Sequence, residues 1–157
     1  MLEQIYNFFN TEMIYLWVNI GVLPFWLLII FFPRSYLCKY FATSIFPIVL
    51  LSSAYVLVLY KAYIGSFDFI ENFNLYLGLA NLSDLFEDNL YLLMFWIHFV
   101  SINLFVGGWM LKDSEKFTIN KIIMFFPLII TYLIGPIGIF IYWIVRIIHA
   151  KKINLYD

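Results

Sequence analysis

Three polar side chains interrupt the apolar segment WIHFVSINLFVGGW, residues 96–109. His98 can exchange a proton near neutral pH, whereas Ser101 and Asn103 only donate and accept hydrogen bonds. On a helix, Ser101 lies about 60° from His98 and Asn103 about 140° from it, so the segment presents polar groups to two neighbours. His98 is therefore either a buried, hydrogen-bonded core residue or a residue that contacts a ligand or transfers a proton.

A haem or metal site would need further ligands close to His98. His149 is the only other histidine, and it lies at the end of the last apolar segment. The single cysteine, Cys38, has no neighbouring cysteine or histidine at the spacing of a metal site. We therefore predict neither a metal nor a cofactor.

A second pattern lies in the last apolar segment, where small and hydroxylated residues recur at intervals of four, three and four. Such spacing places them on one helix face. This face either packs against another helix through its small residues or forms a groove for a ligand. The residues are Thr131, Gly135, Gly138 and Tyr142.

Near the start of the chain, Asn19 and Trp26 are seven residues apart and share a helix face, and Pro24 bends the helix between them. Together with Trp96 and Ser101, these residues complete a candidate binding site. The predicted substrate contacts are Asn19, Trp26, Trp96, Ser101, Thr131, Gly135, Gly138 and Tyr142.

The composition explains which elements must position these side chains. The chain has 157 residues, of which 64% are hydrophobic and 12% are charged, whereas roughly a quarter of the residues of a soluble domain are charged. A membrane protein with one domain, residues 1–157, is expected. The net charge of −1 does not favour nucleic acid as a partner. The first residues carry no basic signal or transit sequence, so we expect location in a bacterial inner membrane.

Crossing the hydrocarbon core takes about 20 apolar residues in a helix. The segments 13–32, 42–60, 90–111 and 122–148 meet this requirement, and Pro136 should kink the last one. We predict an all-α integral membrane four-helix bundle. The two sides of the membrane would carry five and four cations, which does not settle its orientation.

A longer connection joins the second and third predicted spans. Within it Leu82, Leu85 and Phe86 share a helix face, and Asn81 is a candidate N-cap. We predict a short amphipathic helix on the membrane surface.

Three segments, VLPFWLLIIFFPR, FWIHFVSINLFVGGWMLKDS and PLIITYLIGPIGIFIYWIVR, resemble the abscisic-acid-deficient-four-like family, in the same order and spacing. This family comprises plant plastid membrane proteins required for neoxanthin synthesis and many bacterial relatives. The resemblance implies a membrane enzyme that opens a carotenoid epoxide to an allene without a redox change. Such an isomerase needs an acid and a base, and the catalytic positions implied are His98 and Asn103. The family usually has Asp where this chain has Asn103, and a carboxamide cannot transfer a proton.

Two functions follow as hypotheses. The first is an isomerase for a carotenoid or a related isoprenoid dissolved in the membrane lipid. The second is a non-catalytic membrane protein that binds a pigment or lipid or that scaffolds a partner enzyme. A transporter is less favoured, because no intramembrane charge pair or inverted repeat is recognisable in one chain, although an oligomer would change this.

Overall fold

The structure is a computed structural model that describes residues 9–65, 73 and 76–151. Helices make up most of this part of the chain, and none of the described residues forms a β-strand. The predicted all-α fold is confirmed.

Three helical segments are long and apolar enough to cross a membrane. The first is α2 (Thr11–Phe31) and the last is α5 (Asn89–Lys116). The second contains α3 (Phe46–Ile64), which follows a short π-helical turn, η1 (Cys38–Ala42). Long apolar segments adopt this form because a helix satisfies its own backbone hydrogen bonds without water.

The short helix expected between the second and third spans is α4 (Leu79–Phe86). Gly78 stands at its N-cap position and Asn81 lies inside the helix, so the predicted cap is wrong. Its apolar face is nevertheless the predicted one, because only three of its residues are half-buried and the rest are exposed. These three are Leu82, Leu85 and Phe86.

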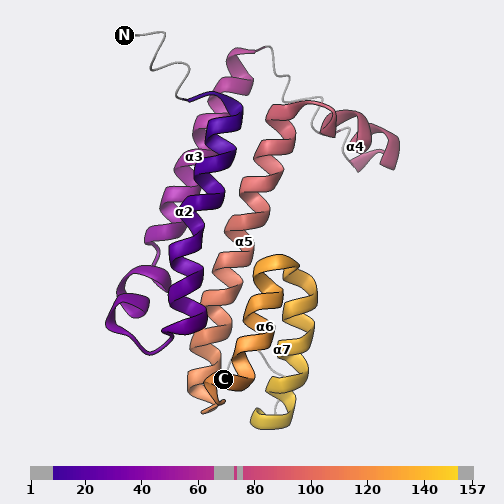
Figure 1. Cartoon of the computed structure of the whole chain (residues 1–157). Coiled ribbons are helices and arrows are strands. Elements are labelled where there is room, and N and C mark those ends of the chain that lie inside the picture. The colour runs from indigo at the N-terminus through magenta and orange to yellow at the C-terminus, as the bar shows by residue number, and fades with distance from the viewer. Residues whose placement is uncertain (1–8, 66–72, 74–75, 152–157) are drawn as a thin grey trace. The chain divides into compact units, whose positions relative to one another are not determined.

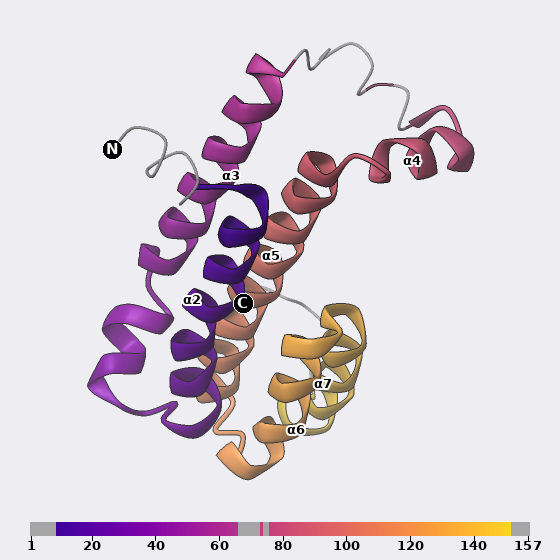
Figure 2. The ribbon, with the colours of Figure 1, turned by 45° about the horizontal axis from the view of Figure 1, so that its top comes forward.

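The segment expected to form a fourth span is not one helix. Instead α6 (Lys121–Leu133) and α7 (Gly135–Ala150) are separated at Ile134, whose φ of −143° and ψ of 83° are not helical. The two helices pack together and lie side by side in Figures 1 and 2. At 1.5 Å per residue they are about 20 and 24 Å long, less than the hydrocarbon thickness of about 30 Å. The prediction of a single kinked span is wrong, because this segment forms a helical hairpin.

Two local features favour the hairpin. Pro136 lies in the first turn of α7, where a missing N–H removes no helical hydrogen bond. Gly138 approaches α6 so closely that a Cβ there would lie 2.6 Å from the Cα of Thr131. The glycine therefore allows the two helices to meet just beyond their turn.

The α6–α7 hairpin packs on the C-terminal half of α5. Contacts along α7 advance in the same direction as contacts along α5, so these two helices run parallel. The pairs, in order, are Gly135 with Asn103, Tyr142 with Trp109, and Arg146 with Asp113.

The chain divides into two compact units. Unit 1 comprises Met1–Gly21 and Val49–Phe99, and unit 2 comprises Val22–Ile48 and Val100–Asp157. His98 and Trp96 belong to unit 1, whereas Asn103 and the whole hairpin belong to unit 2. The predicted site residues therefore do not all belong to one unit.

Candidate functional site

In unit 1, Trp96 and Asn19 form a hydrogen-bonded pair between α5 and α2. The indole Nε1 of Trp96 donates to Oδ1 of Asn19 at 3.2 Å, and Nδ2 of Asn19 donates to the carbonyl of Tyr15 at 2.7 Å. The Tyr15 and Trp96 rings also lie 6.0 Å apart. The structure thus pairs Asn19 with Trp96, whereas the sequence grouped Asn19 with Trp26 on one face.

A cavity of about 470 Å³ lies beside this pair. Tyr15 and Trp96 provide aromatic surface, and Glu12 provides one carboxylate. The other lining residues are Thr11, Asn89, Leu92 and Leu93. The cavity therefore combines aromatic and aliphatic walls with a few polar groups, which is the usual character of a small-molecule site.

His98 lies on a different face of α5. It lies two positions after Trp96, which corresponds to about 200° around the helix. Its side chain is exposed, and none of the described residues forms a hydrogen bond with it. The interpretation of His98 as a buried, hydrogen-bonded core residue is therefore wrong. Its neighbours one and two turns earlier, Phe95 and Leu92, are also exposed.

In unit 2, the carboxamide of Asn103 packs against the first residue of α7. Asn103 is 5% exposed, and a Cβ on Gly135 would lie 2.8 Å from its Cγ. Its Nδ2 is buried without a hydrogen-bond partner among the described residues. A buried amide donor of this kind costs free energy unless something accepts its hydrogen bond.

The small-residue face of α7 is a packing surface in this structure. Gly135 lies against Asn103, and Gly138 lies against Thr131. The Thr131 hydroxyl donates to the carbonyl of Pro127 at 2.7 Å and contacts Sδ of Met110 at 3.5 Å. These contacts fit the packing interpretation, because side chains fill the space that a ligand groove would occupy.

Trp26 is also part of this packing. Its ring lies 5.4 Å from that of Tyr132, and a Cβ on Gly107 would lie 2.6 Å from the edge of the indole. Gly107 therefore allows the close approach of a side chain from α2. Ser101 is half-buried on α5.

A buried polar cluster in unit 2 joins α5 to α7. The Arg146 Nε and the Tyr142 hydroxyl each donate to Oδ2 of Asp113 at 2.6 Å. All three residues are buried, and the Arg146 guanidinium also lies 4.9 Å from the ring centre of Phe117. Charge-assisted bonds of this length are the strong class of hydrogen bond.

The sequence alone does not predict this cluster. Asp113 follows an apolar segment. A charged residue at such a position is usually exposed to water and marks the end of the membrane span. Arg146 lies four residues after Tyr142 and so extends the small-residue face by one turn. This position on the small-residue face was the signal that Arg146 is buried. The sequence does not indicate its carboxylate partner, because Asp113 lies 33 residues earlier.

The two units therefore offer different chemistry. Unit 1 presents an exposed imidazole that can exchange a proton, and a separate aromatic cavity. Unit 2 presents an acid, a phenol and a guanidinium that bind one another. Among the described residues no group of His, Cys, Asp and Glu side chains could hold a metal ion.

Residues 13–142 match the model of the ABA DEFICIENT 4-like family, the family that the sequence resembles. The match includes all the predicted site residues, from Asn19 to Tyr142, and ends before Arg146. No curated protein and no solved structure matches the chain.

Proposed function

Because the chain belongs to the ABA DEFICIENT 4-like family, we propose that it is a membrane enzyme that isomerises a carotenoid or a related isoprenoid. Three helical segments long and apolar enough to cross a membrane support a membrane location, which we assign to the bacterial inner membrane. The observation that carries the proposal is the exposed, unpartnered imidazole of His98, the tenth of the 28 residues of α5. A polar group at that depth is costly in lipid and usually marks function.

The exposure of His98 suits an apolar substrate. A carotenoid is dissolved in the bilayer and reaches a helix surface from the lipid without entering a closed pocket. The exposed side chains of Phe95 and Leu92 supply apolar surface on the same side of α5. A flat polyene lying along this surface would bring its reacting end to His98.

One imidazole can carry the whole proton transfer. The neutral ring accepts a proton from a polyene carbon while the epoxide C–O bond opens, and the C–H electrons form the new double bond of the allene. The imidazolium then returns the proton to the alkoxide oxygen. No electrons leave the substrate, so the product is an isomer of it.

Pigment analysis tests the proposal. Bacterial cells that make epoxidised and plain carotenoids would express the wild type, His98→Ala or His149→Ala, with protein levels matched by immunoblot. We expect the wild type and His149→Ala, which removes the chain's other histidine, to yield an isomer of unchanged mass and shifted absorption. His98→Ala should yield none. Identical pigment profiles for the wild type and His98→Ala contradict the proposal.

Binding without chemistry is a second candidate function. The cavity beside Trp96 favours it, because this cavity has aromatic walls and no histidine among its lining residues. In that case a pigment or lipid co-purifies chemically unchanged, and Trp96→Ala reduces the amount retained. Trp143→Ala is the matched control, since Trp143 is exposed on α7 outside the cavity. Recovery of an altered pigment excludes this second function.

A further inference from the structure

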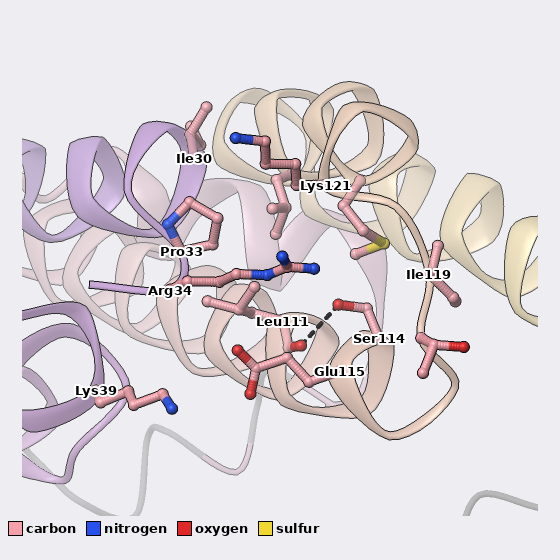
Figure 3. A pocket seen from close by; sticks show the side chains of 12 residues that line it. Ile30, Pro33, Arg34, Lys39, Leu111, Ser114, Glu115, Ile119 and Lys121 are labelled. Atoms are coloured by element: carbon pink, nitrogen blue, oxygen red, sulfur yellow. Dashed lines mark hydrogen bonds between the residues drawn. The ribbon is translucent and has the colours of Figure 1, made fainter. Parts of the chain in front are cut away.

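A second cavity, of about 330 Å³, lies in unit 2 where α2 and α5 end and α6 begins. In Figure 3 the Arg34 side chain extends into it from the end of α2, with Lys121 and Glu115 on either side. None of these residues belongs to the candidate sites described above.

The rim of the cavity is cationic. Arg34, Lys39 and Lys121 line it, and Glu115 is the one carboxylate among its lining residues. The three cations are exposed, and none has an ion-pair partner within the described ranges. An excess of unpaired positive charge around one hollow attracts an anion, and guanidinium and ammonium groups are the usual phosphate ligands in proteins.

The floor of the cavity is apolar. Leu111, Met124 and Leu128 are buried there. The Ser114 hydroxyl is directed to the carbonyl of Leu111 at 2.7 Å, so it is already engaged within the protein. A free phosphate ion would leave this apolar surface uncovered, whereas a phosphate group attached to a hydrocarbon chain would cover it.

The cavity also lies at the level expected for lipid headgroups. Arg34 lies three residues after Phe31, the last residue of α2, and Lys121 is the first residue of α6. Cations at the ends of apolar helices sit where hydrocarbon gives way to headgroups, and they attract anionic lipids.

We propose that this cavity binds the phosphate group of an anionic membrane lipid. Arg34, Lys39 and Lys121 contact the phosphate, and the apolar floor holds the adjoining part of the lipid chain. This site is independent of the proposed isomerase activity, because it shares no residue with the surface around His98.

Lipid-dependent thermal stability of the purified full chain tests the site. Phosphatidylglycerol, phosphatidylcholine and inorganic phosphate would be added separately to the protein in a neutral detergent. We expect phosphatidylglycerol to raise the melting temperature, and phosphatidylcholine and phosphate at equal concentration to leave it unchanged. Equal stabilisation by inorganic phosphate overturns the lipid assignment in favour of a soluble phosphate compound.

Substitutions of the cavity cations test whether phosphatidylglycerol binds in this cavity. In Arg34→Gln/Lys121→Gln the apparent affinity for phosphatidylglycerol should fall at least about tenfold, since each charge-assisted contact typically contributes about that factor. Lys39→Gln should weaken binding less than the double change. Lys151→Gln, which removes an exposed cation outside the cavity, should bind like the wild type. Unchanged affinity in the double variant, or equal weakening in Lys151→Gln, overturns the proposal. All substituted side chains are exposed, and an unchanged melting temperature without lipid verifies folding.

Discussion

The Nε of Arg146 on α7 lies 2.6 Å from the Asp113 carboxylate on α5, although the two residues are 33 positions apart in the sequence. Both side chains are buried, and the Tyr142 hydroxyl donates to the same carboxylate oxygen. One turn earlier on both helices, Trp109 contacts Tyr142. About three turns earlier, Asn103 contacts Gly135. The charge pair thus closes one end of a parallel contact between α5 and α7 that extends to the tip of the hairpin.

Removing one partner of this pair should destabilise the protein strongly. Arg146→Met leaves the Asp113 carboxylate buried without its cation, and such a loss typically costs about 3–5 kcal/mol. We expect a large fall in the melting temperature of the detergent-solubilised protein. Lys112→Met is the control, because Lys112 precedes Asp113 but is exposed.

Removing the charges of both Asp113 and Arg146 should restore part of the stability that Arg146→Met loses. In Asp113→Asn/Arg146→Met no buried charge is left unpaired, so its melting temperature should lie above that of Arg146→Met. A double variant no more stable than the single one would mean that the two side chains do not act as a pair.

The long helices were predictable because length and apolarity alone specify a membrane-crossing helix. The hairpin was not. The sequence IGPIG is compatible with a kinked helix or with a break, since proline is tolerated both at a kink and in a first helical turn. The close approach of Gly138 to Thr131 distinguishes the two, and this is a tertiary contact.

The orientation of His98 was also beyond the sequence. Periodicity identifies the buried face of a helix only when polar and apolar residues alternate around it, and nearly every neighbour of His98 is apolar. A polar residue in such a segment usually faces the interior of a helix bundle. In the structure the buried polar residue of this segment is Asn103, and His98 is exposed.

Adding a methyl group at the hairpin tip should disturb its packing on α5. A Cβ on Gly135 would overlap the Asn103 carboxamide, so Gly135→Ala should lower the melting temperature. Gly21→Ala is the control, because nothing lies within 4 Å of a Cβ there, and replacing a helical glycine by alanine otherwise stabilises by about 0.5–1 kcal/mol. Asn103→Ala should rescue Gly135→Ala. If Gly135→Ala and Gly21→Ala change the melting temperature equally, Asn103 does not lie against the tip of the α6–α7 hairpin.

The hairpin changes the expected topology in the membrane. If α2, α3 and α5 cross and α7 returns to the side where α5 ends, seven of the eight cations among the described residues lie on that side and Lys61 alone lies on the other. The positive-inside rule then places this side in the cytoplasm. The seven are Arg34, Lys39, Lys112, Lys116, Lys121, Arg146 and Lys151.

Cysteine labelling measures this topology. In a Cys38→Ser background, Thr118→Cys and Lys151→Cys should both react with a membrane-impermeant maleimide in inverted vesicles, whereas Ser83→Cys should react only in right-side-out cells. All three substituted positions are exposed. Labelling of Thr118→Cys and Lys151→Cys from opposite sides would show that 122–148 crosses the membrane as a single span.

Replacement by leucine should destabilise the protein at Asn19 and stabilise it at Asn103. The carboxamide of Asn19 bonds Trp96 and the Tyr15 carbonyl, so Asn19→Leu removes two hydrogen bonds and should cost about 0.5–2 kcal/mol. The Asn103 amide nitrogen is buried without a partner. Asn103→Leu keeps a similar volume and removes that unsatisfied donor, which should stabilise the protein by about 1–3 kcal/mol. Melting temperatures of both variants in the same detergent measure the difference. A destabilised Asn103→Leu would show that a water or a bound ligand accepts the hydrogen bond of this amide.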